Sequence, residues 1–152
     1  MLLVVAGPVL GRGGRTLADW QRDLRDPTVD VRVRAAHALV AFDRRAVPVL
    51  TGALGDKEYR VRASAADALV KMPSSHVVPG MIEALRNADP GVRANAAVVL
   101  GAFGPAAKHA VPALASALTD PNLRVRELAG EALNRIVSPG PNQPTTLPLN
   151  CH

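Results

Sequence analysis

The chain repeats one nine-residue pattern four times, and this repetition restricts its fold more than any other feature. The pattern is Val-Arg-x-x-Ala-Ala-x-Ala-Leu, in which Val99 and Gly130 replace two of the alanines. It begins at Val31, Val61, Val92 and Val125 and therefore recurs after 30, 31 and 33 residues. A helical unit of this length cannot bury its own apolar stripe, so it must stack on its neighbours. The sequence thus predicts an α-solenoid.

Two further positions keep a constant distance from this pattern. An acidic or amide residue stands five residues before each copy: Asp26, Asp56, Asn87 and Asp120. Eight residues before that stand Ala18, Pro48, Pro79 and Pro112. This spacing predicts that each unit is a pair of helices joined by a short turn that holds the acidic or amide residue. We name the first helix of each pair the leading helix, the second the Val-Arg helix, and the joint between them the within-repeat turn.

Apolar periodicity and helix-breaking residues predict eight helices in all. The leading helices are expected at 16–25, 46–54, 77–86 and 109–119. The Val-Arg helices are expected to start at N-cap side chains, namely Thr28, Asp89 followed by Pro90, and Asn122, with Glu58 as the weak exception. The within-repeat turn never changes its length, whereas the between-repeat turn varies. We therefore expect the between-repeat edge to accept insertions.

The units resemble HEAT repeats and, within that family, the bacterial HEAT-like repeats named after phycobilisome lyases. The last unit carries the resemblance best, through Val111, Pro112, Leu114, Leu118, Asp120, Val125, Arg126 and Leu133. The resemblance implies an all-α protein, a right-handed α-solenoid of about four HEAT-like helix-pair repeats. HEAT-like chains include scaffolds, lyase-type proteins and DNA glycosylases, so the resemblance implies a fold and no single function.

Composition and the two ends of the chain complete the domain organisation. The 152 residues are 48% hydrophobic but only 3% aromatic, so the core must be built from Ala, Leu and Val. The repeat domain is expected over 16–137, between an apolar, Gly-rich segment (1–15) and a Pro-rich tail (138–152) that we predict to be disordered. The single Cys151 excludes an intramolecular disulfide and a cysteine metal cluster.

The apolar N-terminal residues are too few to span a bilayer, so no membrane span is expected. They either cover the first repeat or form the end of an export signal whose start lies upstream. The compartment therefore stays open, with the cytoplasm as the default. At the other end, the last Val-Arg helix has an apolar stripe without a following leading helix: Val125, Leu128, Leu133 and Ile136. We expect the tail, a second copy of the chain or further repeats to cover it.

Arginine and acidic residues recur together along the chain. The arginines are Arg32, Arg62, Arg93 and Arg126, and the turn residues are Asp26, Asp56, Asn87 and Asp120. A phosphate-binding row would not need an acid at each step, so we interpret the set as a structural ladder. In this ladder each acid pairs with an arginine of its own or an adjacent repeat and caps turn amides. Asn87 cannot form an ion pair, so its joint is expected to rely on neutral hydrogen bonds.

The resemblance implies that the leading helices line the concave surface, and their exposed positions are mainly small or neutral. The candidate lining residues are Thr51, Gly52, Gly80, Glu83, Ala113 and Ser116. Acidic and basic side chains balance in these four segments, whereas a groove that neutralised phosphates would carry several uncompensated cations. This surface therefore fits a peptide or a helix of a protein partner better than a nucleic-acid duplex.

The net charge of +5 has its excess on the between-repeat edge. The candidate anion-binding residues there are Arg44, Arg45, Lys71, His76, Lys108 and His109. Because the N-terminal ends of the leading helices lie at this edge, their dipoles also favour an anion. The competing interpretation is a solvated edge that confers solubility. The two histidines are expected to lie too far apart for a metal site.

No combination of residues in the sequence indicates a nucleophile, a phosphate loop or a catalytic acid pair. We therefore predict a noncatalytic interaction or scaffold module that binds a protein or peptide, without a cofactor or metal. The alternatives are a nucleic-acid or anion-binding protein that uses the basic edge, and a noncatalytic subunit of a lyase-type enzyme. The sequence leaves open the partner, the oligomeric state and whether the chain is part of a longer array.

Overall fold

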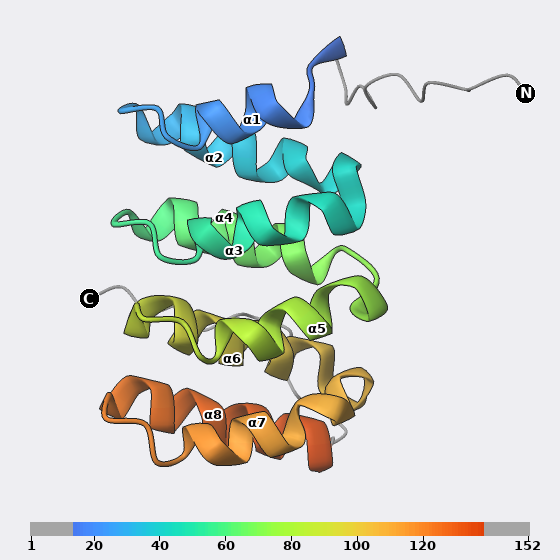
Figure 1. The fold of residues 1–152 in the computed structure, drawn as a ribbon, viewed down its shortest axis with the longest axis vertical. Helices are drawn as coiled ribbons and strands as arrows, with labels where there is room; N and C mark the ends of the chain where they lie inside the picture. The colour runs from blue at the N-terminus through green and yellow to red at the C-terminus, as the bar shows by residue number, and fades with distance from the viewer. Residues whose placement is uncertain (1–13, 139–152) are drawn as a thin grey trace, which may run out of the picture.

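The computed structural model describes residues 14–138, which form four helix pairs stacked one on another (Figure 1). The leading helices are α1 (Leu17–Asp23), α3 (Val47–Ala53), α5 (Ser74–Ala84) and α7 (Val111–Ala117). The Val-Arg helices are α2 (Val29–Ala38), α4 (Tyr59–Val70), α6 (Pro90–Phe103) and α8 (Leu123–Val137). The predicted all-α solenoid and the order of its eight helices are confirmed. Our expectations for 1–13 and 139–152 concern residues outside the described range.

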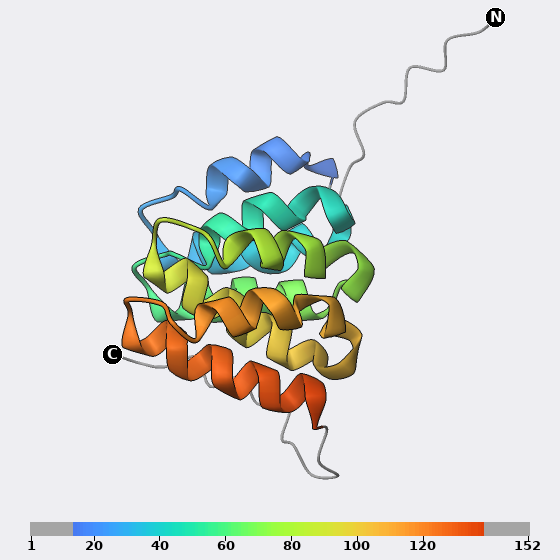
Figure 2. The same cartoon turned by 60° about the horizontal axis from the view of Figure 1, so that its bottom comes forward.

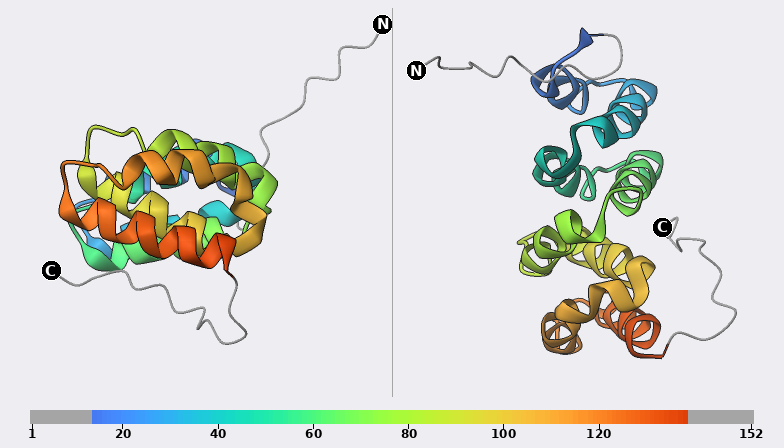
Figure 3. Two further views of the ribbon diagram at one scale, coloured as in Figure 1. Left: turned by 90° about the horizontal axis from the view of Figure 1, so that it is seen from below. Right: turned by 90° about the vertical axis from the view of Figure 1, so that its right-hand side faces the viewer.

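The helices lie in two rows. Seen from the side in Figure 3, the leading helices form one row and the Val-Arg helices the other. Figure 2, in which the lower end of the stack is turned forward, shows α7 and α8 together as the last pair. The within-repeat turns all lie at one edge of the stack, on the left in Figure 1, and the between-repeat turns lie at the opposite edge. Equivalent turn residues are therefore neighbours along an edge.

Side-chain caps define the starts of three helices, α1, α6 and α8. Asp89 accepts the Gly91 N–H at 2.7 Å, and Asn122 accepts the N–H groups of two residues in the first turn of α8. Thr28 occupies the N-cap position of α2 without a side-chain cap bond. Sequence analysis missed the capping box of α1, in which Thr16 and Asp19 bond reciprocally. Hydrogen bonds from the Thr16 backbone and hydroxyl, in that order, lower the pKa of Asp19.

The between-repeat turns differ more than their lengths suggest. The first contains the 3-10 segment η2 (Leu39–Ala46) and the third contains η3 (Gly104–Ala110), whereas the second is short. There, α5 begins at Ser74, three residues before the predicted start, because the extended Pro73 acts as its N-cap. Pro79 consequently lies inside α5 and not in its first turn. It cannot donate a backbone hydrogen bond there.

The core is a continuous strip of small aliphatic side chains between the two rows. Leu39, Leu69 and Leu100, which close three copies of the pattern, are fully buried. The stripe of α8 is also largely buried: Val125, Leu128 and Ile136 are at most 5% exposed, because α8 packs on α6, η3 and α7. Our expectation that this stripe needs a further cover is therefore wrong for these three residues.

One described stretch, Pro90–Ala117, is long and apolar enough to cross a membrane by length and composition alone. In the fold this stretch consists of α6, η3 and α7, and the chain turns back at Gly104, whose φ is +53°. Of its most apolar window, 44% is buried inside the protein. Part of its apolar character therefore belongs to the core between the third and fourth repeats.

Candidate functional site

The ladder arginines are anchored in the within-repeat turns of their own repeats. In every case the Nη1 atom donates to the carbonyl oxygens of the turn residue and of the residue after it. These two distances are 2.8 and 3.1 Å for Arg32, 2.8 and 2.9 Å for Arg62, 2.9 and 3.1 Å for Arg93, and 2.7 and 3.1 Å for Arg126. Each guanidinium therefore closes its own turn by satisfying carbonyls that the helices leave free.

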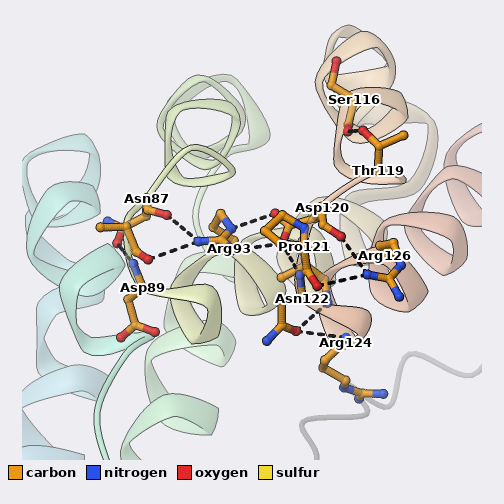
Figure 4. A network of polar contacts seen from close by, with 12 residues as sticks. Asn87, Asp89, Arg93, Ser116, Thr119, Asp120, Pro121, Asn122, Arg124 and Arg126 are labelled. Carbon is orange, nitrogen blue, oxygen red and sulfur yellow. Dashed lines mark hydrogen bonds and ion pairs between the residues drawn. The ribbon is translucent and has the colours of Figure 1, made fainter.

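The opposite edge of the guanidinium, formed by Nε and Nη2, reaches the next repeat. Arg32 binds both carboxylate oxygens of Asp56 at 2.9 and 3.1 Å, and Arg93 binds both oxygens of Asp120 at 2.8 Å (Figure 4). The Arg93 side chain is 13% exposed and that of Asp120 is 10% exposed. The hydrogen bond from Arg93 lowers the pKa of Asp120, and the same bond raises the pKa of Arg93. We call each such cross-repeat pair a rung.

All four turn residues share a second contact. The side-chain Oδ1 accepts the backbone N–H two residues further on, at 2.7 Å for Asp26, 2.8 Å for Asp56, 2.9 Å for Asn87 and 2.8 Å for Asp120. An amide oxygen makes this bond as well as a carboxylate oxygen does. The turn therefore tolerates asparagine, whereas the bidentate rung requires an acid.

The middle junction accordingly lacks a rung. Within residues 14–138, Arg62 keeps both Nη1 bonds, but its Nε and Nη2 have no hydrogen-bond or ion-pair partner. Asn87 makes its turn bond and does not bond Arg62. We expected neutral hydrogen bonds at this joint, and one is present: the Asn95 Nδ2 of α6 donates to the Leu54 carbonyl oxygen at the end of α3, at 2.8 Å. It involves neither Arg62 nor Asn87, so the rung itself is not replaced.

The surface of the leading helices carries two grooves. The α3–α5 groove, of about 340 Å³, is lined by Val47, Pro48, Thr51, Gly80, Glu83, Ala84 and Asn87. The α1–α3 groove, of about 310 Å³, is lined by Gln21, Leu24, Arg25, Pro48, Val49, Gly52, Ala53 and Asp56. Of the predicted lining residues, Thr51, Gly80 and Glu83 thus share one groove and Gly52 lies in the other. Ala113 and Ser116, on α7, line neither.

Close packing explains part of this arrangement. A Cβ atom on Gly80 would lie 2.9 Å from the Val47 Cγ1, so the glycine lets α5 approach α3 at the base of the groove. The hydroxyl groups of Thr51 and Ser116 donate to carbonyls four residues earlier in their own helices. A side chain added at Gly52 would meet nothing within 4 Å. The predicted small residues therefore shape the surface more than they offer polar groups to a ligand.

The two rows of helices are not equally close. At the first and last junctions, the Val-Arg helices pack on each other more extensively than the leading helices do. Small residues allow this approach: a Cβ atom on Gly101 of α6 would lie 3.0 Å from the Ala132 Cα of α8. The expectation that the leading helices line the concave surface stays a prediction. They present separate grooves on the more open row.

The basic edge is partly neutralised by acids. His76, on α5, lies with its Nδ1 2.7 Å from Asp43 of the preceding repeat, and Lys71 lies 2.6 Å from Asp67. Asp43 has a φ of +51°, which is rare for a residue with a side chain. The remaining predicted edge residues are exposed: Arg44, Arg45, Lys108 and His109. The structure thus does not align all six in one uncompensated row.

Sequence analysis missed two ion pairs between α2 and α4. Asp30 pairs with Arg60 at 2.9 Å, and His37 lies 3.9 Å from Asp67. In both pairs the partners occupy the same position of successive repeats, so aligning the units and comparing charges would have revealed them. No group of three or more His, Cys, Asp or Glu side chains that could hold a metal ion lies within 14–138.

Comparisons with known proteins agree with this geometry. A family model described as HEAT repeats matches residues 20–80 and 78–149. No curated protein matches the sequence. Human deoxyhypusine hydroxylase in complex with glycerol is 26% identical, with a TM-score of 0.59, over 84% of this chain and 46% of that one. An engineered protein is 25% identical, with a TM-score of 0.47, over 82% of this chain and 63% of its own.

A further similar structure is the complex of CpcE and CpcF of phycocyanin lyase from a Nostoc species. It is 22% identical, with a TM-score of 0.41, over 91% of this chain and 71% of that one. This likeness shows the fold alone. The chain spans less than half of deoxyhypusine hydroxylase and less than two thirds of the engineered protein.

Proposed function

Because the chain belongs to the HEAT-repeat family, we propose that it is a noncatalytic binding or scaffold module that holds a peptide segment of a protein partner in the α3–α5 groove. The groove itself is the observation that carries this proposal. It is open, about 340 Å³ in size, and lined mainly by aliphatic and small side chains with Glu83 as its single charge. Such a lining favours burial of apolar side chains over phosphate binding.

The ladder orders the two pairs of repeats on either side of the α3–α5 groove, whereas the junction at the groove itself has no rung. The rungs between Arg32 and Asp56 and between Arg93 and Asp120 each join two successive repeats through partly buried bidentate bonds. A surface that is already ordered loses less entropy when it binds a peptide than one that must become ordered. Asp43 lies 2.7 Å from His76 and Asp67 lies 2.6 Å from Lys71, and these acids make the between-repeat edge the weaker candidate for a polyanion.

A peptide selection with matched groove variants tests the proposal. Short random peptides would be selected on the immobilised full chain, and their affinities measured by fluorescence anisotropy. Thr51→Trp places a bulky ring in the groove, whereas Ala115→Trp places the same ring at the equivalent position of α7, which lines neither groove. We expect Thr51→Trp to weaken the selected peptides roughly tenfold or more, about 1.4 kcal/mol. Ala115→Trp should leave their affinity unchanged.

Circular dichroism controls for folding in both variants. The proposal fails if no peptide is selected above background. It also fails if the two tryptophan variants, both folded, weaken binding equally, because a general effect of a surface tryptophan would then explain the loss.

A further inference from the structure

We propose that the guanidinium edge of Arg62 that lacks a rung is a recognition site for a carboxylate, supplied by an Asp or Glu side chain of the peptide partner. This inference rests on the proposed function and narrows the chemistry of the partner. It starts from a comparison of three arginines at equivalent positions, of which two hold a carboxylate from the next repeat and one does not.

Arg62 is held in the same way as the two arginines that form rungs. Its Nη1 donates to the carbonyl oxygens of Asp56 and Lys57 at 2.8 and 2.9 Å. The guanidinium group is planar and its five N–H groups have fixed directions, so anchoring Nη1 twice also orients Nε and Nη2. The ring of Tyr59 lies 5.9 Å from the guanidinium carbon and further restricts it. The Nε and Nη2 groups of Arg62 are therefore already oriented in the absence of a ligand.

The occupied rungs show which group this edge accepts. At Arg32 and Arg93 it binds two carboxylate oxygens at distances of 2.8 to 3.1 Å. Asn87 replaces the acid at the Arg62 junction, and its terminal NH₂ is a donor that cannot satisfy other donors. The acid nearest in sequence to Asn87, Asp89, caps α6 through Gly91 and forms no ion pair with Arg62 within the described residues.

The junction that lacks a rung lies beside the proposed groove. Asn87 is the turn residue of this junction and also lines the α3–α5 groove, so the groove ends where the rung is missing. We infer that a peptide whose apolar side chains occupy the groove extends past Asn87 and offers an acidic side chain to Arg62. A bidentate bond between arginine and carboxylate is directional, so it would set the position of the peptide as well as add to its affinity.

Nuclear magnetic resonance of the arginine side chains tests this site. The probes are a blocked peptide, Ala-Leu-Glu-Leu-Ala, and its Gln counterpart, each titrated into the full chain to ~20 mM. This concentration lies above the millimolar Kd expected when the ion pair and burial of the two leucines contribute together. The Nε–H signal of Arg62 reports binding, and that of Arg93, whose edge is occupied, is the internal control. We expect the Glu peptide to shift the Arg62 signal until it saturates. The Gln peptide should not shift the Arg62 signal, and neither peptide should shift the Arg93 signal.

Asn87→Asp provides the decisive variant. It should complete the rung inside the chain without removing any contact, so the fold is retained while the affinity of the Glu peptide falls by roughly tenfold or more. Three results overturn the proposal: an unresponsive Arg62 signal, an equal response to the Gln peptide, or an unchanged response in Asn87→Asp. If selected peptides still lose affinity in Thr51→Trp while Arg62 is unresponsive, the groove function stands and the carboxylate site is rejected.

Discussion

At the scale of single residues, one arginine position in each repeat makes two separate contributions. Its Nη1 closes the turn of its own repeat, and its other edge joins the next repeat where an acid is available. The acidic turn residue likewise makes two kinds of bond: its side chain accepts a backbone N–H of its own turn, and it also forms the rung. Asparagine at position 87 keeps the first contribution and loses the second. A single amide in place of a carboxylate therefore separates local from cross-repeat stabilisation.

This separation predicts opposite effects for two reciprocal substitutions. Asp120→Asn removes a partly buried bidentate rung and should lower the free energy of unfolding by about 1 to 3 kcal/mol, the range for hydrogen bonds to charged groups. Asn87→Asp adds a more exposed rung and should raise it by about 0.5 to 1 kcal/mol. Equilibrium urea denaturation at neutral pH measures both. Equal effects of the same sign would show that the local turn bond, and not the rung, determines the outcome.

The same rung predicts a pH dependence. Arg93 holds the pKa of Asp120 below its ordinary value of 3.8. A carboxylate whose pKa is lower in the folded chain stabilises the fold above the unfolded pKa, and this contribution is lost as the pH falls through the folded pKa. The stabilities of the unmodified chain and of Asp120→Asn should therefore converge as the pH falls below ~3.8. A constant difference across this range would contradict the assignment.

At the scale of elements, small residues decide which helices approach closely. The Ala-rich pattern places little volume between Val-Arg helices, and Gly101 lets α6 meet the backbone of α8. Between the leading helices, grooves remain on the surface. The first and third between-repeat turns contain 3-10 segments of different lengths, and the second contains none.

Burial at the helix contacts predicts a large effect for one core leucine. Leu100 is fully buried in α6, between the third and fourth repeats. Leu100→Ala should lower the free energy of unfolding by about 2 to 5 kcal/mol through lost burial and a residual cavity. Leu118→Ala, at a leucine that is 43% exposed at the end of α7, is the matched control and should change stability by less than about 1 kcal/mol. A small loss at Leu100 in thermal and urea denaturation would mean that the helix register is wrong.

The positions of the helices could largely be predicted from the sequence, because periodic apolar residues and caps act over a few neighbouring residues. All eight helices were predicted, and Asp89 and Asn122 cap as expected. The start of α5 was missed because the spacing of apolar residues indicated a start at residue 77, whereas Pro73 serves as the N-cap and the helix begins at Ser74. The choice between own-repeat and next-repeat partners for the ladder acids was left open, because it depends on how the helix pairs stack.

At the scale of the whole molecule, the two rows of helices differ. The Val-Arg helices form a closely packed side, and the leading helices form a side that carries grooves. The ladder runs along the within-repeat edge, the Val-Arg helices pack tightly, and the leading helices expose the grooves. The last pair also exposes Leu123 and Val137, which are 59% and 65% exposed. The proposed groove shares Val47 and Ala84 with the core and Asn87 with the ladder, so substitutions at these three residues should change both binding and stability.

Hydrogen exchange measured by mass spectrometry, on the full chain with and without a selected peptide, tests the central claim most directly. The account predicts slower exchange in α3, in α5 and in the turn that contains Asn87, because a peptide in the α3–α5 groove covers these elements. Exchange in α8 should not change. Protection confined to the Val-Arg helices or to the between-repeat edge, with none in α3 and α5, would contradict the account.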